Sequence, residues 1–313
     1  MANAVQVVGF SGFIGNQVFE ALASEGGRVV GNSRTSVCFR GFGSIDERLE
    51  PVYRQKRIDD VFIAKDVNVI VFCAGLAHLN TPEDTRLNDF VSVNCDLPMG
   101  YAEAAIRSGV SRFVYLSSIG VHGEGSVQPY NELSSYASSD AYSGSKVLAE
   151  KKLIELFKKS ECELVIIRPP MVYGPEAPGN FSRLASLVQK RIPLPLGGLN
   201  NQRSFLFVGN LVSFILRCIE HPNAAGQVFV VSDDDDVSTR DFVARIAKAQ
   251  ELRCILLPLP AVLFKAVMTL VGQGRAAGKL AAPLTVDCSH AKRSLGWVPP
   301  YSLAEGIRLS FPD

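Results

Sequence analysis

The sequence predicts an α/β protein with a Rossmann-type, doubly wound parallel sheet and a smaller C-terminal lobe. Three observations predict it. Short apolar strands alternate with helix-length stretches through the first half of the chain, which indicates a parallel sheet covered on both faces. A glycine-rich turn joins the first strand to the first helix. After about Pro175, glycine, proline and asparagine become frequent and the strict alternation ends. We therefore divide the chain into a cofactor domain, residues 1–175, and a substrate lobe, residues 176–313.

The elements of the first half follow from their hydrophobic pattern. Nearly continuous apolar runs are typical of strands buried on both faces, whereas longer stretches with one apolar side are typical of helices. Strands are predicted at 5–9, 28–31, 67–73, 112–117 and 164–168, with a weak one near 49–53, and helices at 14–24, 97–108 and 141–159. In the second half we expect short helices and strands over the end of the sheet, and a solvated turn at Asp233–Asp236, with a cation site there as the alternative.

Composition excludes several classes of protein. With 32 basic and 31 acidic residues, a net charge of +1 and no basic stripe, nucleic acid is not an expected partner. The seven cysteines are odd in number and lack metal-binding spacing, which predicts free thiols in a cytoplasmic protein and no metal site. We expect no signal peptide. The apolar stretch 256–271 is interrupted by prolines and Lys265, so it predicts no membrane span. A core or pocket helix and docking on a membrane surface both remain open for it.

The turn after the first strand has the features of a dinucleotide-binding loop. Gly9 permits the tight turn, Gly12 lets the backbone approach a pyrophosphate, and Gly15 lets helix and strand lie close together. Phe13 and Ile14 supply amide groups at the helix N-terminus, where the helix dipole favours anions. The alternative is a loop whose glycines serve only for turning.

The end of the second strand bears on the choice of cofactor. In NAD-binding proteins, an acidic residue about 20 positions after the glycine loop accepts a hydrogen bond from the ribose 2′-hydroxyl. Here Asn32, Ser33 and Arg34 follow instead, and a guanidinium binds a 2′-phosphate that an acid would repel. The sequence therefore favours NADP(H) over NAD(H), unless Arg34 is an ordinary surface arginine. Asp59 is a candidate for contacting adenine or for capping a helix.

Three side chains form a candidate catalytic group. Tyr142 and Lys146 are four residues apart near the start of a predicted helix and so share one face. We expect the ammonium to lower the pKa of the phenol, so that Tyr142 exchanges a proton near neutral pH. Ser117 and Ser118 come at the end of the preceding strand, at the sheet edge where ligands bind, and a serine hydroxyl there could hold the same substrate oxygen.

Taken together, these motifs resemble the extended short-chain dehydrogenase/reductase family, in the branch that acts on nucleotide sugars. The resemblance runs through nearly the whole chain. It implies that Cys73, Ala74 and Gly75 lie beside the nicotinamide ribose, that Asn94 is structural, and that Ser118 is the catalytic hydroxyl. It also implies that Tyr142 and Lys146 contact the cofactor, and that the turn containing Pro169 seats the nicotinamide. Gly296 and Trp297 match the C-terminal signature. The chain departs from the pattern in lacking the second-strand acid, in having His122 where tyrosine is commoner, and in the short 31–67 segment.

The resemblance also implies where the substrate binds. Asn180 and Arg203 would contact the pyrophosphate of a nucleoside diphosphate, with Arg275 or Lys279 as a second positive contact and His78 near the sugar. A loop-capping role for Asn180, a surface salt bridge for Arg203 and a surface position for His78 are the alternatives. The resemblance also implies a homodimer formed through two helices per subunit, which the residues of this sequence do not by themselves predict.

Two reactions fit the catalytic group. The first is NADP(H)-dependent reduction of a 4-keto sugar at carbon 4 of a UDP-linked hexose or N-acetylhexose, in the synthesis of surface-polysaccharide precursors. The alternative is a UDP-sugar 4-epimerase, on UDP-glucose and UDP-galactose or their N-acetyl forms. A non-catalytic NADP-binding sensor is the minor alternative, and it has no need of a complete set of Ser118, Tyr142 and Lys146. We expect the reductase, because Arg34 suits the reduced NADPH pool.

Overall fold

The computed structural model describes residues 4–34, 36–41, 49–50, 61–77 and 87–311. Two predicted contact residues, Asp59 and His78, lie outside this part of the chain, and the side chain of Arg275 is likewise outside it.

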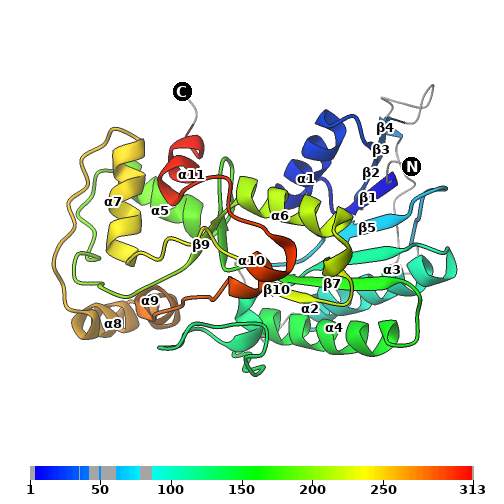
Figure 1. Cartoon of the computed structure of the whole chain (residues 1–313). Helices are drawn as coiled ribbons and strands as arrows, with labels where there is room; N and C mark the ends of the chain where they lie inside the picture. The colour runs from blue at the N-terminus through cyan, green and yellow to red at the C-terminus, as the bar shows by residue number, and fades with distance from the viewer. Residues whose placement is uncertain (1–3, 35, 42–48, 51–60, 78–86, 312–313) are drawn as a thin grey trace.

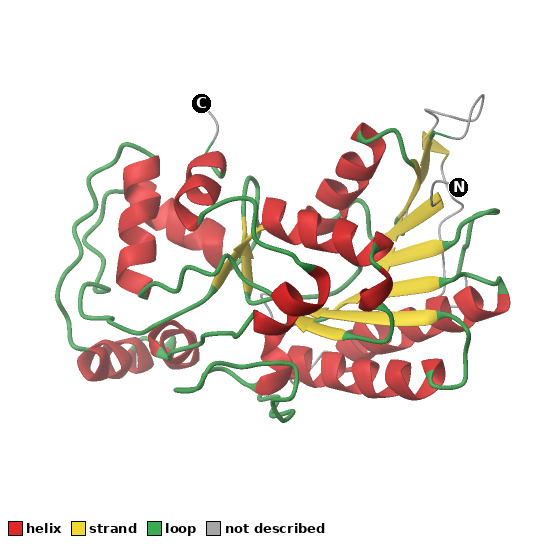
Figure 2. Cartoon of the chain, viewed as in Figure 1, coloured by secondary structure: helices red, strands yellow, loops and turns green. Residues whose placement is uncertain are grey.

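A central sheet organises the molecule, with strands in the order β10-β7-β6-β5-β1-β2-β3-β4. Six of these strands run parallel, as the predicted fold requires (Figure 2). They are β1 (Ala4–Val8), β2 (Arg28–Asn32), β5 (Val69–Phe72), β6 (Arg112–Leu116), β7 (Glu163–Arg168) and β10 (Val228–Val230). The predicted doubly wound α/β fold is confirmed. Five of these parallel strands, β1, β2, β5, β6 and β7, lie within a few residues of their predicted positions.

The edge of the sheet differs from the prediction. After β2 the chain turns back at once, and β3 (Val37–Arg40) pairs antiparallel with β2, followed by β4 (Leu49–Glu50) against β3. The turn is closed by the Ser33 amide, which donates to the Ser36 carbonyl at 2.9 Å. β3 was not predicted, because its four residues alternate too briefly to be distinguished from a loop.

Helices cover both faces of the sheet, and the strands alternate between two cores. On β5, Val69 and Val71 lie in one hydrophobic cluster and Ile70 and Phe72 in the other, as the two-residue period of a strand requires. The first face is covered by α1 (Phe13–Ser24) and α6 (Val208–Glu220) and the second by α3 (Leu97–Arg107) and α4 (Ala141–Phe157) (Figure 1). α3 continues directly from α2 (Leu87–Val91) and a π-helical turn, η2 (Ser92–Asp96).

Most of the chain after Pro175 lies beyond one end of the sheet (Figure 1). This part contains β9 (Phe205–Phe207), which pairs in parallel with β8 (Met171–Tyr173) from just before Pro175. Its helices, besides α6, are α5 (Asn180–Gln189), α7 (Thr239–Ala249), α8 (Ala261–Leu270), α9 (Gly274–Ala281), α10 (Ser289–Leu295) and α11 (Leu303–Leu309). The same half returns to the main sheet with α6 and β10. The division at residue 175 stays a prediction.

The expectation of a solvated turn at Asp233–Asp236 holds for the exposed Asp234 and Asp236 but is wrong for Asp233. Asp233 is buried and accepts hydrogen bonds from the Tyr173 hydroxyl at 2.7 Å, the Phe207 amide at 2.8 Å and Asn210 Nδ2 at 2.7 Å. These donors come from β8, β9 and α6, so one carboxylate joins three elements. The sequence shows four acidic residues in a row but not which of them the fold turns inward.

Thiols, metals and membrane spans can be assessed within the described chain. Its seven cysteines are all free thiols. The described residues include no group of metal-ligating side chains and no helix with the length and apolarity that a membrane span needs.

Candidate active site

The predicted site residues lie at one edge of the sheet. β1, β5 and β6 are parallel neighbours, so their carboxyl ends face the same way, and Gly9, Cys73 and Ser118 come just after these ends. In an open α/β sheet this is the edge where ligands bind. The topology therefore brings together a glycine loop, a Cys-Ala-Gly turn and the candidate catalytic strand.

The glycine loop leaves no room for side chains at two of its positions. Gly9 has a φ of 89°, and a Cβ there would lie 2.7 Å from the Ala74 amide nitrogen. A Cβ on Gly15 would lie 2.2 Å from the Gly9 carbonyl oxygen. The loop and the Cys-Ala-Gly turn are therefore in backbone contact, which only glycine permits.

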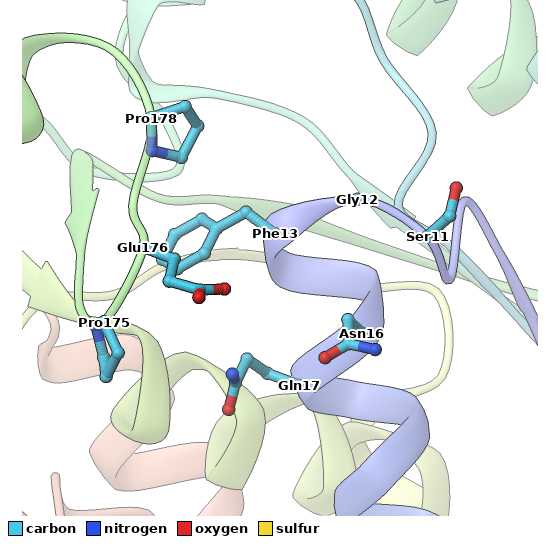
Figure 3. A pocket seen from close by; sticks show the side chains of 8 residues that line it. All are labelled: Ser11, Gly12, Phe13, Asn16, Gln17, Pro175, Glu176 and Pro178. Carbon is cyan, nitrogen blue, oxygen red and sulfur yellow. The ribbon is translucent and has the colours of Figure 1, made fainter.

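The N-terminus of α1 opens toward a pocket. Its N-cap is Gly12, which offers no side-chain cap, and no acidic residue stands in the first turn. A pocket of about 470 Å³ adjoins this end, between Ser11–Phe13 and the Pro175–Pro178 turn (Figure 3). Uncapped amides and a positive dipole end suit a pyrophosphate. These residues fit a dinucleotide, with Gly12, Phe13 and Ile14 as the amides that would hold its phosphates.

The three residues at the end of β2, Asn32, Ser33 and Arg34, are placed differently from one another. Asn32 is buried, and its Oδ1 accepts a hydrogen bond from the Tyr101 hydroxyl at 2.6 Å. Ser33 is buried in the hairpin turn, with its Oγ 3.0 Å from Ser36 Oγ. Arg34 is exposed at the tip of that turn. Of the three, Arg34 is therefore the side chain best placed to meet a 2′-phosphate, and its cofactor role stays a prediction.

The candidate catalytic side chains meet where predicted. Tyr142 lies in the first turn of α4, and its hydroxyl is close enough to that of Ser118, the residue that caps η3 (Ile119–His122), for Ser118 to act on its pKa. Ser118 Oγ also accepts from the Gly120 amide at 3.1 Å. The two hydroxyls therefore converge on one point at the carboxyl end of β6.

Lys146 lies one turn further along α4, and its ammonium is buried at the same strand end. Its Nζ donates to the Leu116 carbonyl at 2.9 Å and lies 4.7 Å from the centre of the Tyr115 ring. A Cβ on Gly75 would approach it to 3.4 Å, so the Cys-Ala-Gly turn borders the same point. Burial lowers the pKa of Lys146 to about 8. The charge is therefore held in a desolvated position between β6 and the turn after β5.

The phenol does not have the lowered pKa that the sequence led us to expect. Burial raises the pKa of Tyr142, the nearby Ser118 hydroxyl opposes that effect, and Asp140 adds to it. Lys146 directs its ammonium at the Leu116 carbonyl and the Tyr115 ring. Sharing a helix face with a cation is therefore not enough to lower a phenol's pKa when burial disfavours the phenolate.

Two polar anchors fix α4 in position. The side chain of Asp140 accepts from the Ser143 amide at 2.7 Å and completes a capping box with Ser143. Asn94, in the π-helical turn η2, donates to Ser145 Oγ at 3.0 Å and accepts from the Leu76 amide at 2.7 Å. Asn94 therefore ties α4 to the Cys-Ala-Gly turn, which agrees with its predicted structural role.

A buried ion pair one turn of α4 beyond Lys146 was not predicted from the sequence. Glu150, one further turn along α4, pairs with Arg168 at 2.6 Å and accepts from Ser117 Oγ and from the Tyr136 hydroxyl. Both charged side chains are at most 3% exposed. A signal was available, because Arg168 ends an otherwise apolar strand and a buried guanidinium requires a carboxylate partner. Nothing in the sequence says which acid it is.

His122, noted as a departure from the family pattern, belongs to this network. Its Nε2 lies 3.1 Å from Arg168 Nη1 and its Nδ1 lies 3.0 Å from the Ser135 carbonyl. The guanidinium is always a donor, so the ring is neutral, with Nε2 accepting and Nδ1 donating. Burial lowers the pKa of His122, which agrees with that assignment.

The predicted substrate residues lie apart from this cluster. Asn180 is exposed at the start of α5. Arg203 Nη1 donates to the Lys279 and Ala282 carbonyls at 2.6 and 2.8 Å, and burial lowers the pKa of its guanidinium to about 10. Lys279 pairs with Asp140 at 2.7 Å. Arg203 and Lys279 therefore connect α9 with the rest of the molecule, and any contact with substrate stays a prediction.

Comparison with known proteins places this geometry in a family. The model of the NAD dependent epimerase/dehydratase family matches residues 5–232. A UDP-glucose 4-epimerase of Vibrio cholerae is 38% identical over 98% of this chain and 94% of its own length. An N-acetyl-α-D-glucosaminyl-diphospho-ditrans,octacis-undecaprenol 4-epimerase of Escherichia coli O157:H7 is 24% identical over the same shares.

Solved structures agree with the fold. A UDP-glucuronic acid 4-epimerase from Bacillus cereus, in complex with NAD, superposes with a TM-score of 0.75 at 20% identity, covering 97% of this chain and 96% of that one. The predicted family and the predicted enzyme class, an NAD(P)-dependent nucleotide-sugar epimerase or reductase, are thereby confirmed. The chain belongs to the NAD dependent epimerase/dehydratase family, within the extended short-chain dehydrogenases/reductases.

Proposed function

We propose that the protein is a 4-epimerase of UDP-linked hexoses, with Ser118, Tyr142 and Lys146 as its catalytic residues. The observation that carries this proposal is the similarity to the V. cholerae UDP-glucose 4-epimerase over almost the full length of both chains. The convergence of Tyr142, Ser118 and Lys146 at one strand end supports it, because epimerisation needs a proton acceptor beside a sugar hydroxyl. This choice reverses the preference for a reductase that Arg34 suggested.

The proposed chemistry assigns each residue a part. Tyr142 takes the proton from the sugar 4-hydroxyl as a phenolate, which its raised pKa makes the minor form in the free protein, and returns it after the sugar has presented its other face. Ser118, whose hydroxyl lies close to that of Tyr142, holds the same oxygen through both steps. Lys146 keeps a positive charge near the reacting oxygen. A nicotinamide dinucleotide, held by the amides of Gly12, Phe13 and Ile14, would accept and return the hydride, so that no cofactor would be consumed.

The carrier of the sugar is proposed to be a nucleoside diphosphate. The E. coli relative is named for a sugar on undecaprenyl diphosphate, but its identity to this chain is lower than that of the V. cholerae protein. Both carriers present a diphosphate, and Arg203 and Asn180 remain the predicted contacts for it. A panel of UDP-glucose, UDP-galactose and their N-acetyl forms tests the proposal directly. We expect interconversion of a pair of carbon-4 epimers at constant absorbance of the reduced nicotinamide.

Reduction of a UDP-linked 4-keto sugar is the second candidate, and Arg34 is the observation that favours it. An exposed guanidinium at the end of β2 suits the 2′-phosphate of NADPH, the usual reductant in biosynthesis. NADP preference remains a prediction. Arg34→Ala should lower affinity for NADPH about tenfold and leave that for NADH nearly unchanged. Equal losses for both cofactors would remove the argument for a reductase. Consumption of one NADPH per keto sugar, with no epimerisation, would establish the reductase.

A further inference from the structure

Helix α8 presents an apolar surface to solvent. Its exposed side chains form two rows with the four-residue spacing of a helix face, Val262–Ala266–Leu270 and Leu263–Val267–Val271. Val262 and Leu270 are 78% and 87% exposed, whereas Phe264, on the opposite side, is buried. We name the exposed residues Val262, Leu263, Val267, Leu270 and Val271 the α8 patch. Contiguous exposed apolar surface of this kind marks an interaction site.

The surroundings of the patch are cationic. From Leu252 to Val286 the sequence contains no aspartate or glutamate, but it does contain Arg253, Lys265, Arg275 and Lys279. Arg253 and Lys265 are exposed. Lys265 lies on α8 itself, and Arg253 lies on the segment that leads into the helix. The chain segment that carries the patch is therefore cationic.

We propose that the α8 patch docks on an anionic membrane surface. Apolar side chains enter the boundary between headgroups and acyl chains, while Lys265 and its basic neighbours meet anionic headgroups. With ten residues, α8 is too short to span a bilayer, so it lies in the plane of the interface. A second copy of the chain is the less suitable occupant, because a two-fold contact would bring the same basic residues against each other.

The position of α8 makes such docking sterically reasonable. α8 and α9 lie together at the outer end of the C-terminal lobe, away from the main sheet (Figure 1). α9 in turn contacts the catalytic domain through Lys279, which pairs with Asp140 at the start of α4. The patch can therefore meet a membrane while the sheet edge stays open to water. This inference does not depend on which reaction the enzyme catalyses.

Co-sedimentation of the full-length protein with vesicles tests the proposal. One set of vesicles is phosphatidylcholine alone, and the other contains phosphatidylglycerol as well. We expect binding to the anionic vesicles, weakened at least tenfold by the double substitution Val262→Glu, Leu270→Glu. Lys265→Glu should weaken it about fivefold. The matched control is Val298→Glu, since Val298 is an exposed apolar residue outside the patch and should leave vesicle binding unchanged.

The outcomes separate membrane docking from self-association. Equal binding to both kinds of vesicle, or equal weakening by Val298→Glu, overturns the assignment of the patch. Light scattering that detects a dimer abolished by the double substitution, together with no vesicle binding by the unmodified protein, assigns the patch to a second copy instead. Epimerisation of soluble UDP-sugars should continue in the double variant, which shows that the variant is folded and separates this test from that of the proposed function.

Discussion

The sheet domain and the C-terminal lobe each contain a buried carboxylate that joins several elements, and the two are stabilised differently. Glu150, beside the catalytic group, is paired with the guanidinium of Arg168. Asp233, in the lobe, is held by a phenol, a backbone amide and a side-chain amide, and burial raises its pKa to about 6. The comparison teaches that charge is compensated where the proposed chemistry occurs. In the lobe, the carboxylate is held by neutral donors, and its environment is sensitive to pH.

The largest effect should come from a change to Tyr142, in the sheet domain, and it should be an effect on turnover. Tyr142→Phe removes the proposed proton acceptor but keeps the ring against its neighbour Phe90. Turnover should fall about 10²- to 10⁴-fold, the usual range for a general acid–base group, with little change in cofactor affinity. Steady-state kinetics and cofactor titration measure the two quantities. Turnover near that of the unmodified enzyme would remove Tyr142 from the mechanism.

Breaking the ion pair of the sheet domain should have the next largest effect. Glu150→Ala leaves Arg168 buried without its carboxylate and removes an acceptor from Ser117 and Tyr136. The free energy of unfolding should fall by about 3–5 kcal/mol, measured by denaturant titration. Glu124→Ala, which removes a half-buried partner of Lys279, is the matched control and should cost under about 1 kcal/mol. Similar losses of unfolding free energy in both variants would show that the buried Glu150–Arg168 pair contributes no more to stability than the Glu124–Lys279 pair.

In the lobe, the buried carboxyl of Asp233 should make the free energy of unfolding depend on pH. Because the folded pKa of Asp233 lies above its usual value, the folded protein binds this proton more tightly than the unfolded chain. The resulting stability is fully present below about pH 4 and is lost as pH rises through about 6. Asp233→Asn removes this dependence. The free energy of unfolding of the unmodified protein, relative to the variant, should therefore rise by about 2 kcal/mol between pH 7 and 4. A constant difference would show that Asp233 is ionised without penalty.

Arg203 should give the smallest effect and decide whether the lobe holds the diphosphate. Its guanidinium already donates to two carbonyls, so Arg203→Ala should cost about 1.5–3 kcal/mol of stability whether or not it binds substrate. If it also contacts the diphosphate, UDP affinity should fall about tenfold while cofactor affinity is kept. Calorimetric titration of UDP into both proteins distinguishes the roles. Unchanged UDP affinity with lowered stability would leave Arg203 a purely structural residue.

Sequence reasoning was most accurate where a residue's role depends on local pattern. The parallel strands, the glycine turn and the position of Tyr142 and Lys146 one turn apart on α4 follow from periodicity, strand ends and helix spacing. The choice of Ser118 over Ser117 came from the family resemblance. It failed where long-range burial decides the outcome. The raised pKa of Tyr142, the pairing of Glu150 with Arg168 and the inward turn of Asp233 depend on elements far apart in the sequence. The hairpin after β2 was missed because its strand is short.

The central claim is that one site oxidises and re-reduces the same carbon of a UDP-sugar. The measurement that tests it most directly follows a deuterium label placed on carbon 4 of UDP-glucose, with the product analysed by mass spectrometry and NMR. We expect UDP-galactose that retains the deuterium on carbon 4, formed without net change in reduced nicotinamide. Loss of the label from the product, or no epimer at all together with consumption of NADPH on a 4-keto sugar, would contradict it.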